Sequence, residues 1–191
     1  VTSGSIKIDG IDVRDFNIKT LRSKIGFIRQ KTLLFTGSIK SNIKFGKRKA
    51  SHEEMVHSAK VAQAYDFINK KEKKFDEPIG EGGSNVSGGQ KQRLSIARAL
   101  VRKPEIYIFD DSFSALDFKT DAILRAELKK ETTHAIVLIV AQRIGSIMDA
   151  DKIIVLDEGN VVGIGKHKEL LKTCSVYKEI ALSQLTEEEL A

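Results

Sequence analysis

The run from Glu105 to Asp110 (Glu-Ile-Tyr-Ile-Phe-Asp) constrains the fold of this chain more than any other feature. Its central residues are apolar without alternation, a pattern typical of a strand that is buried on both faces, as in a parallel sheet. Two consecutive carboxylates, Asp110 and Asp111, end the run. Ligands bind at the carboxyl ends of the strands in open α/β sheets. The sequence therefore predicts an α/β fold with acidic residues at a binding edge.

A second stretch, Asn85 to Arg93 (Asn-Val-Ser-Gly-Gly-Gln-Lys-Gln-Arg), has the composition of an anion site. Ser87 supplies a hydroxyl at a predicted helix start, and Gly88 and Gly89 let backbone N–H groups approach a ligand with no Cβ in the way. The positive end of the helix dipole would point at the same residues. A bare Ser-Gly-Gly also occurs where a helix only satisfies its own first N–H groups. One buried face of this helix is predicted from three apolar residues, Leu94, Ala97 and Val101.

Hydrophobic patterning predicts the remaining elements. The expected strands are Ser5–Asp9, Lys24–Ile28, Ala135–Ala141 and a hairpin of Lys152–Leu156 with Asn160–Ile164. The expected helices lie within Ser38–Lys70, with Met55, Ala59 and Ala62 on one face and a capping box at Ser51 and Glu54, then at Phe118–Lys130 and His167–Leu190. The stretch from Ile11 to Arg22 carries Asp, Asn and Thr residues that suit caps or turns.

The stretch from Asn85 to Arg93 resembles the signature motif of ATP-binding cassette (ABC) ATPases, and the strand ending in acids follows where that family has its Walker B motif. Three further stretches resemble family motifs, in family order: a Q-loop at Gln30–Ile39, a D-loop at Phe113–Asp117 and a switch loop at Ile139–Ile144. A loop at Glu77–Gly83 is similar to the X-loop of exporters. The resemblance implies a P-loop NTPase-like (RecA-like) sheet core, formed by residues 1–35 and 104–191, and an inserted helical subdomain at residues 36–103.

The resemblance also implies roles for individual residues. Gln30 would help to coordinate Mg²⁺ and link the nucleotide site to transmembrane coupling helices, and Asp110 would hold Mg²⁺ through its water shell. Asp117 would belong to the nucleotide site, although a role as helix N-cap alone would explain it. Taken alone, Gln30 is more typical of an exposed surface loop than of a ligand-binding residue. The residues that would contact ATP across a dimer are Ser87, Gly88, Gly89 and Gln90.

Two catalytic positions depart from the family pattern. Asp111 stands where the family usually has glutamate, and Gln142 where it has histidine. Hydrolysis needs a carboxylate that orients the attacking water and a group on the γ-phosphate. Aspartate is shorter by roughly 1.5 Å, and a misplacement of ~1 Å can cost about a hundredfold in rate. Gln142 can donate a hydrogen bond but cannot carry a proton. The pair predicts a site that binds ATP and hydrolyses it slowly.

The phosphate-binding motif of P-loop ATPases, G-x-x-x-x-G-K-[ST], is not found in the sequence. Near matches at Gly46-Lys47-Arg48 and Gly165-Lys166-His167 lack the final Ser or Thr and the first glycine. In the family this Walker A motif precedes the strand expected at Ser5–Asp9. We therefore expect a parent protein that carries the motif, its preceding strands and a transmembrane domain upstream, and an isolated chain that is inactive.

Charge and apolar content limit the possible partners. The 32 basic and 26 acidic residues give a net charge of +6, but they are mostly interspersed, which indicates a solvated surface rather than a nucleic-acid site. Cys174 is the one cysteine, so no internal disulfide can form and a reducing compartment is expected. The apolar run Ala135–Ala141 is far shorter than the ~20 residues of a membrane-spanning helix. Any membrane role is expected to come through other segments.

The resemblance as a whole implies the ATP-binding domain of an ABC exporter, with ATP and Mg²⁺ as cofactors, on the cytoplasmic face of the plasma (inner) membrane. Such domains pair head to tail, so we expect a second nucleotide-binding domain as partner, in a heterodimer in which this chain's own site is the degenerate one. A soluble ABC-type ATPase of DNA repair or chromosome maintenance is an alternative, although no coiled-coil or zinc insertion is seen. A non-hydrolytic regulatory ATP-binding module is another.

Overall fold

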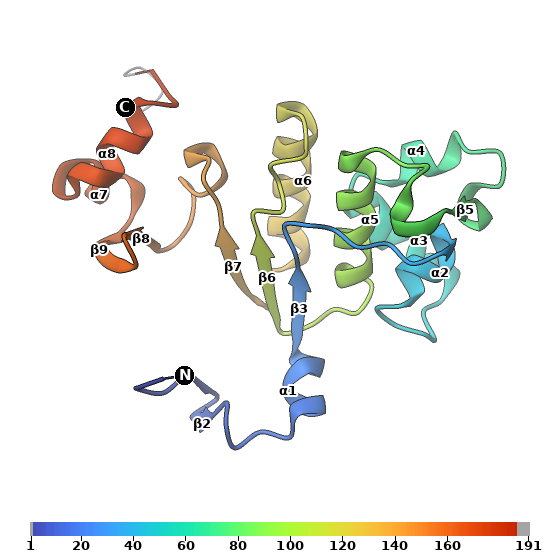
Figure 1. Cartoon of the computed structure of the whole chain (residues 1–191), viewed down its shortest axis with the longest axis horizontal. Helices are drawn as coiled ribbons and strands as arrows, with labels where there is room; N and C mark the ends of the chain where they lie inside the picture. The colour runs from blue at the N-terminus through green and yellow to red at the C-terminus, as the bar shows by residue number, and fades with distance from the viewer. Residues whose placement is uncertain (1, 187–191) are drawn as a thin grey trace. The chain divides into compact units, whose positions relative to one another are not determined.

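The computed structural model describes residues 2–186 (Figure 1). The chain forms two compact units, Val1–Leu138 and Ile139–Ala191. The first holds the predicted sheet and most of the helices, and the second holds a hairpin with two helices. These two units are not the predicted division into a core and an inserted helical subdomain, which stays a prediction.

A sheet has three strands in the order β3-β6-β7, and all but the last two residues of β7 belong to the first unit. The strands are β3 (Ile25–Ile28), β6 (Ile106–Asp110) and β7 (Ile136–Val140). β3 and β6 run parallel, with Ile25 opposite Ile106 and Ile28 opposite Phe109, and Figure 1 shows all three arrows pointing the same way. Ile106, Tyr107 and Phe109 are buried. Because neighbours in the strand point to opposite faces, β6 is covered on both sides, as predicted.

Helix α5 (Gly88–Leu100) begins at the predicted anion motif and buries the predicted face. Leu94 and Ala97 are fully buried, and Val101 follows the last helical residue in the same buried environment. α5 packs against β3 and against the helices that precede it in the chain, α2 (Ile39–Lys44) and α3 (His52–Val61). The short elements between α3 and α5 are α4 (Tyr65–Asn69), η1 (Lys74–Asp76), β5 (Pro78–Ile79) and η2 (Glu81–Gly83), and β5 pairs with β4 (Gly37–Ser38).

The helical face predicted at residues 55–62 is confirmed. Met55, Ala59 and Ala62 are all buried. Ser51 accepts a hydrogen bond from the Glu54 N–H, and the Glu54 side chain accepts one from the Ser51 N–H, so the predicted capping box is present. A further helix, α6 (Phe118–Glu131), joins β6 to β7 close to its predicted bounds.

A helix that the sequence pattern did not predict, α1 (Ile18–Lys24), lies near the start of the chain. None of its residues is buried, so it has no apolar stripe to indicate it. Its start is set by Asn17, whose side-chain oxygen accepts hydrogen bonds from the N–H groups of Lys19 and Thr20. Before it, β1 (Lys7–Ile8) pairs with β2 (Ile11–Asp12) across a turn at Asp9 and Gly10. Both turn residues have positive φ, as in a two-residue hairpin turn of type I′.

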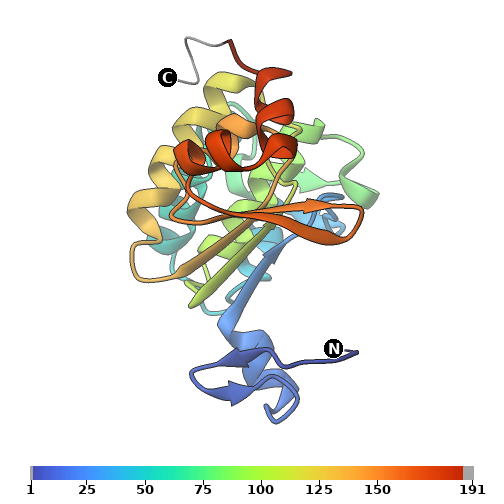
Figure 2. The same ribbon diagram turned by 90° about the vertical axis from the view of Figure 1, so that its left-hand side faces the viewer.

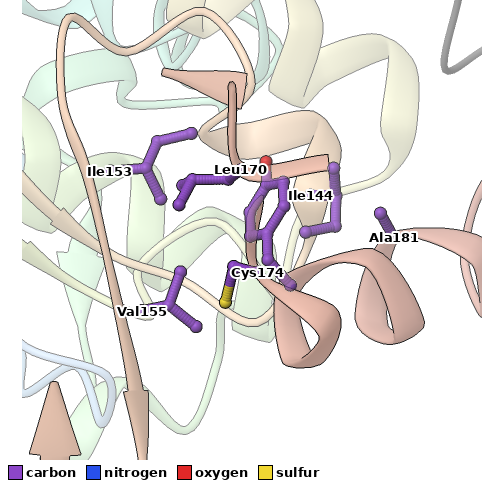
Figure 3. Close-up of a cluster of buried hydrophobic side chains, with 7 residues drawn as sticks. Ile144, Ile153, Val155, Leu170, Cys174 and Ala181 are labelled. Carbon is purple, nitrogen blue, oxygen red and sulfur yellow. The ribbon is translucent and has the colours of Figure 1, made fainter. Parts of the chain in front are cut away.

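The second unit is built on the predicted hairpin of β8 (Ile153–Asp157) and β9 (Asn160–Gly165), which Figure 2 shows along its length. Its turn, Glu158 and Gly159, again has positive φ at both residues. α7 (His167–Thr173) and α8 (Ser175–Leu182) cover the hairpin (Figure 3). The core consists of Ile144, Ile153, Val155, Leu170, Cys174, Tyr177 and Ala181. The helical prediction for residues 187–190 lies outside the described residues.

None of the helices within residues 2–186 combines the length and the apolar character needed to cross a bilayer. Cys174 is buried and carries a free thiol.

Candidate functional site

The carboxyl ends of β3 and β6 bring Gln30 and Asp111 together. Gln30 follows β3 by two residues, and its side-chain N–H donates a hydrogen bond to Oδ2 of Asp111 over 2.9 Å. Asp110 is the last residue of β6 and lies at the same edge, because the two strands are parallel. The predicted binding edge of the sheet therefore carries an amide and two carboxylates.

The turn after β6 is held against β3 by a buried serine. The hydroxyl of Ser112 is fully buried and donates a hydrogen bond to the backbone carbonyl of Ile28 over 2.8 Å. Asp111 adopts φ +43°, in the left-handed region that few residues other than glycine occupy. Aspartate is among the residues that tolerate this region best. The direction of the Asp111 carboxylate is thus fixed by its backbone as well as by Gln30.

The start of α5 has the donors that the sequence predicts for an anion. Ser87 and Gln90 form a reciprocal capping box, in which the Gln90 N–H donates to the Ser87 hydroxyl over 3.3 Å and the Ser87 N–H donates to Oε1 of Gln90 over 3.2 Å. The N–H groups of Gly88 and Gly89 belong to the first helical turn, which has no intrahelical acceptors for them. A side chain at Gly88 would meet open space. The first two amides of α5 are therefore available to an anion.

Gly89 is required for a different reason. A Cβ at this position would come within 3.1 Å of the backbone oxygen of Ala115. The Phe113–Asp117 loop therefore packs directly against the start of α5, and only glycine allows this approach without a shift. Ser87–Gln90 and the pair of Gln30 with Asp111 share no hydrogen bond in residues 2–186. The geometry gives two separate groups on this chain rather than one pocket.

Asp117 is the N-cap of α6. Its side chain accepts hydrogen bonds from the N–H of Thr120 over 2.9 Å and from the Thr120 hydroxyl over 2.7 Å. These bonds, first that from the backbone N–H, lower the pKa of Asp117 below its ordinary value of 3.8, and the positive charge of Arg93 acts in the same direction. The capping interpretation of Asp117 is confirmed, while its role toward a nucleotide stays a prediction.

Replacing Asp117 with Asn is expected to change the acid limb of the stability profile. A carboxyl group with a lowered pKa in the folded state stabilises the fold above pH 3.8, and this stabilisation is lost as the pH falls through the lowered pKa. Asn keeps a capping oxygen but does not titrate. In thermal melts between pH 2 and 7, the Tm of Asp117→Asn should therefore fall less steeply with decreasing pH than the Tm of the wild type. Asp117→Ala should be less stable than both at neutral pH. Identical acid limbs in wild type and Asn variant would contradict the assignment.

Gln142, the other predicted catalytic residue, belongs to the second unit. It follows β7, and its backbone carbonyl accepts a hydrogen bond from the side chain of Gln184 over 2.8 Å. The same Gln184 side chain accepts a hydrogen bond from the Ile144 N–H over 2.9 Å. Gln184 therefore holds the segment on both sides of Arg143. Sequence reasoning missed this residue, because a polar residue near a helix end carries no local signal.

The signature helix also holds the segment that follows β3, through residues that the sequence motif did not single out. Gln92 is only 3% exposed and contacts Arg29 and Thr32. Arg98 donates to the backbone oxygens of Asn42 and Leu33. A usable signal existed for Gln92, since it lies four residues before Ile96 and eight before Leu100, which places it on the buried face.

The donor atoms of these residues fit Mg²⁺ and phosphate. The carboxylate of Asp110 and the side-chain oxygen of Gln30 are hard oxygen ligands of the kind Mg²⁺ prefers, and this ion is usually held by one or two carboxylates together with substrate phosphates. Within residues 2–186 no cluster of three or more His, Cys, Asp or Glu side chains could hold a metal by itself. The oxygen donors of Asp110 and Gln30 suit an ion that is shared with a phosphate group.

Comparisons with known proteins place the chain in a family. A family model described as ABC transporter matches residues 1–114. The chain is 46% identical over 186 residues to an uncharacterized ABC transporter ATP-binding protein of Bacillus subtilis, covering 97% of this chain and 32% of the relative. It is 42% identical over 180 residues to a putative multidrug export ATP-binding/permease protein of Staphylococcus aureus, covering 94% and 31%.

A solved structure of a bacterial Atm1-family ABC exporter with ATP bound superimposes with a TM-score of 0.92 at 36% identity, covering 95% of this chain and 32% of that one. This likeness, together with the family match, confirms the predicted P-loop NTPase fold class. The chain spans about a third of the length of the curated relatives it matches.

Proposed function

Because this chain belongs to the ABC transporter family, we propose that it is the ATP-binding domain of an exporter. In the whole protein it would couple the binding and hydrolysis of ATP to the export of a substrate across a membrane. The names of relatives, which include a putative multidrug export ATP-binding/permease protein, and the likeness to an exporter structure support this choice over a soluble ABC-type ATPase. The proposed place is the cytoplasmic face of the plasma (inner) membrane, with a transmembrane domain of the same transporter as a partner.

The observation that carries the proposal is the contact between Gln30 and Asp111 at the carboxyl edge of β3 and β6, next to Asp110. Mg²⁺ bound there would neutralise charge on the ATP phosphates. Asp110 and the side-chain oxygen of Gln30 would hold the ion. We also propose the division into a core of residues 1–35 and 104–191 and a helical subdomain of residues 36–103, since Gln30 lies just before their junction.

A second ATP-binding domain would complete each site. The free amides of Gly88 and Gly89 and the hydroxyl of Ser87 form a group that shares no hydrogen bond with Asp111 or Gln30 on this chain. In a head-to-tail dimer, Ser87–Gln90 would therefore contact the γ-phosphate of ATP bound to the partner. Asp117 would help to seat the loop that packs on Gly89. We propose a heterodimer, because this chain has an intact signature motif at Ser87–Gln90 but altered catalytic residues at Asp111 and Gln142.

The catalytic residues of this chain's own site would be weak. Asp111 is shorter than glutamate, and one of its oxygens already accepts a hydrogen bond from Gln30. It would therefore hold the attacking water less well. Gln142 would donate one hydrogen bond to the γ-phosphate without carrying charge. The site would bind ATP and turn it over slowly, whereas the partner's site, completed by Ser87–Gln90, would be the productive one.

Restoring both catalytic side chains should raise turnover at this site. In the full-length protein paired with its partner, Asp111→Glu combined with Gln142→His is expected to speed the slow phase of single-turnover hydrolysis, which belongs to this chain's own site, by about ten- to a hundredfold, since a ~1 Å correction can change a rate by about a hundredfold. Asp157→Glu makes the same chemical change at the end of β8 and serves as the control. No increase would contradict the degenerate site, and no turnover in any variant would favour a non-hydrolytic regulatory module.

A further inference from the structure

Gln92 is a buried polar side chain whose partners all lie in one segment of the chain. Its side-chain oxygen accepts a hydrogen bond from the Thr32 hydroxyl, and its side-chain N–H donates to the backbone oxygen of Arg29 over 3.4 Å. It is 3% exposed. A buried amide without partners is costly, so these contacts fix its position.

The two contacts of Gln92 lie on either side of Gln30. Arg29 precedes Gln30, and Thr32 follows it by two residues. Gln30 itself reaches Asp111 through its side chain. The backbone that carries Gln30 is therefore held from one side by the carboxyl edge of the sheet and from the other by Gln92.

Gln92 also lies close to the start of the helix that carries it. It is five residues after the N-cap Ser87, which corresponds to about 7–8 Å along an α-helix that rises 1.5 Å per residue. Helices are stiff over two turns, so a displacement of Gln92 must displace the first turn. The same side chain thus connects Gln30 with the amides of Gly88 and Gly89.

A second set of contacts prevents the segment from moving independently of α5. Arg98 donates hydrogen bonds to the backbone oxygen of Leu33 over 3.0 Å and to that of Asn42 over 2.9 Å. The Asn42 side chain accepts from the Phe35 N–H and donates to the Phe35 carbonyl. The segment from Arg29 to Phe35 is therefore attached to α5 near both of its ends.

We propose that Gln92 is a positioning residue that ties Gln30 to the signature helix, so that the state of this chain's own nucleotide site sets the placement of Ser87–Gln90 in the partner's site. This inference rests on the proposed function, because it needs two sites that this chain contributes to. A ligand that displaces Gln30 would alter the backbone around Thr32. Gln92 would pass that change to the start of α5.

The test is a set of double-mutant cycles in the full-length protein paired with its partner. Gln30→Ala, Thr32→Val and Gln92→Met would be made singly and in pairs, and kcat and KM for ATP hydrolysis would be measured. We expect Thr32→Val and Gln92→Met each to lower kcat about fivefold or more with little change in KM, within the range typical of coupling between sites. Their double variant should be no slower than the slower single variant, since both remove one interaction.

The same non-additivity is expected between Gln92→Met and Gln30→Ala: the loss of kcat caused by Gln30→Ala should shrink at least fivefold in the Gln92→Met background. Thr32→Ser keeps the hydroxyl and should restore the wild-type rate. Thr132→Val is the matched control, because it removes a buried hydroxyl that donates to the Leu128 carbonyl at the C-terminal end of α6, away from the proposed site residues. It should leave kcat unchanged. If Gln92→Met does not fold, Thr32→Val and Thr32→Ser still decide the question.

Effects that simply multiply would overturn the inference, as would equal kcat values for Thr32→Val and Thr132→Val. Ser87→Arg, measured in parallel, distinguishes a failure of the role of Gln92 from a failure of the proposed function. If Ser87→Arg abolishes hydrolysis while the cycles are multiplicative, only the role of Gln92 is wrong. If Ser87→Arg leaves hydrolysis intact, the proposed function is wrong and the role of Gln92 falls with it.

Discussion

Replacing Ser87 with arginine is expected to abolish ATP hydrolysis by the full-length protein paired with its partner. Ser87 caps α5, and its hydroxyl lies beside the first amides of that helix. An arginine there would place a long side chain where the partner's γ-phosphate is proposed to lie. It would also remove the cap, at a cost of about 1 kcal/mol. Because removal of one stabilising donor can already cost about 10²–10³ in kcat, blocking the whole group should reduce turnover below detection.

The measurement is single-turnover hydrolysis of ATP by the assembled protein. Ser51→Arg is a matched control, since Ser51 caps α3 with the same kind of reciprocal capping box but contributes no proposed site residue. It should lose a similar amount of stability and keep its hydrolysis. If Ser87→Arg retains a rate near that of Ser51→Arg, the productive site does not depend on this signature, and the two halves have been assigned wrongly.

The parts of the fold that the sequence predicted correctly are those whose signal is local. Strand β6 follows from four consecutive apolar residues, and its burial on both faces follows from the lack of alternation. The face of α5 formed by Leu94 and Ala97 follows from helical periodicity. The β8-β9 turn follows from the Glu158-Gly159 pair. In each case the residues that set the structure are close together in the chain.

The features that escaped prediction depend on partners far along the chain. Gln92 pairs with Thr32, which is 60 positions away, and Arg98 reaches Leu33, 65 positions away. Helical spacing could have placed Gln92 on the buried face of α5, but its hydrogen-bond partners are decided by packing, and a motif cannot show them. The left-handed conformation of Asp111 also has no sequence signal, because glycine is the usual indicator of that region. Helix α1 was missed because none of its residues is buried, so its only signals were a cap at Asn17 and basic residues in its last turn.

Sequence reasoning located the candidate site residues along the chain, and their roles toward a nucleotide stay predictions. Gln30 and Asp111 follow strands that the apolar pattern located, and parallel pairing then brought them together. The close approach of Ala115 to Gly89 could not be foreseen, because it depends on how the loop after β6 packs on α5. The second glycine of the motif therefore has a packing reason beside the binding reason that sequence reasoning gave it.

Replacing Arg98 with methionine is expected to destabilise the fold more than any other single change considered. The Arg98 guanidinium is largely buried, and burial lowers its pKa to about 10, which still leaves it charged at neutral pH. It satisfies the backbone oxygens of Leu33 and Asn42 and lies 5.2 Å from the Phe35 ring centre. A hydrogen bond to a charged group contributes about 1.5–3 kcal/mol. Losing two while leaving their acceptors unpaired should cost about 3–5 kcal/mol.

For a domain of this size, a loss of about 3 kcal/mol corresponds to a fall of roughly 6–12 °C in Tm. Thermal melting of the full-length protein, with limited proteolysis between α2 and α5, would measure it. Arg98→Lys keeps the charge but cannot reach several acceptors at once, so its Tm should lie between that of the wild type and that of Arg98→Met. Arg14→Met removes an exposed ion pair with Asp12 and should have a much smaller effect. Equal melting of Arg98→Met and Arg14→Met would mean that the Arg98 contacts do not hold the segment after β3. The same attachment that Gln92 needs to position Ser87 would then be missing.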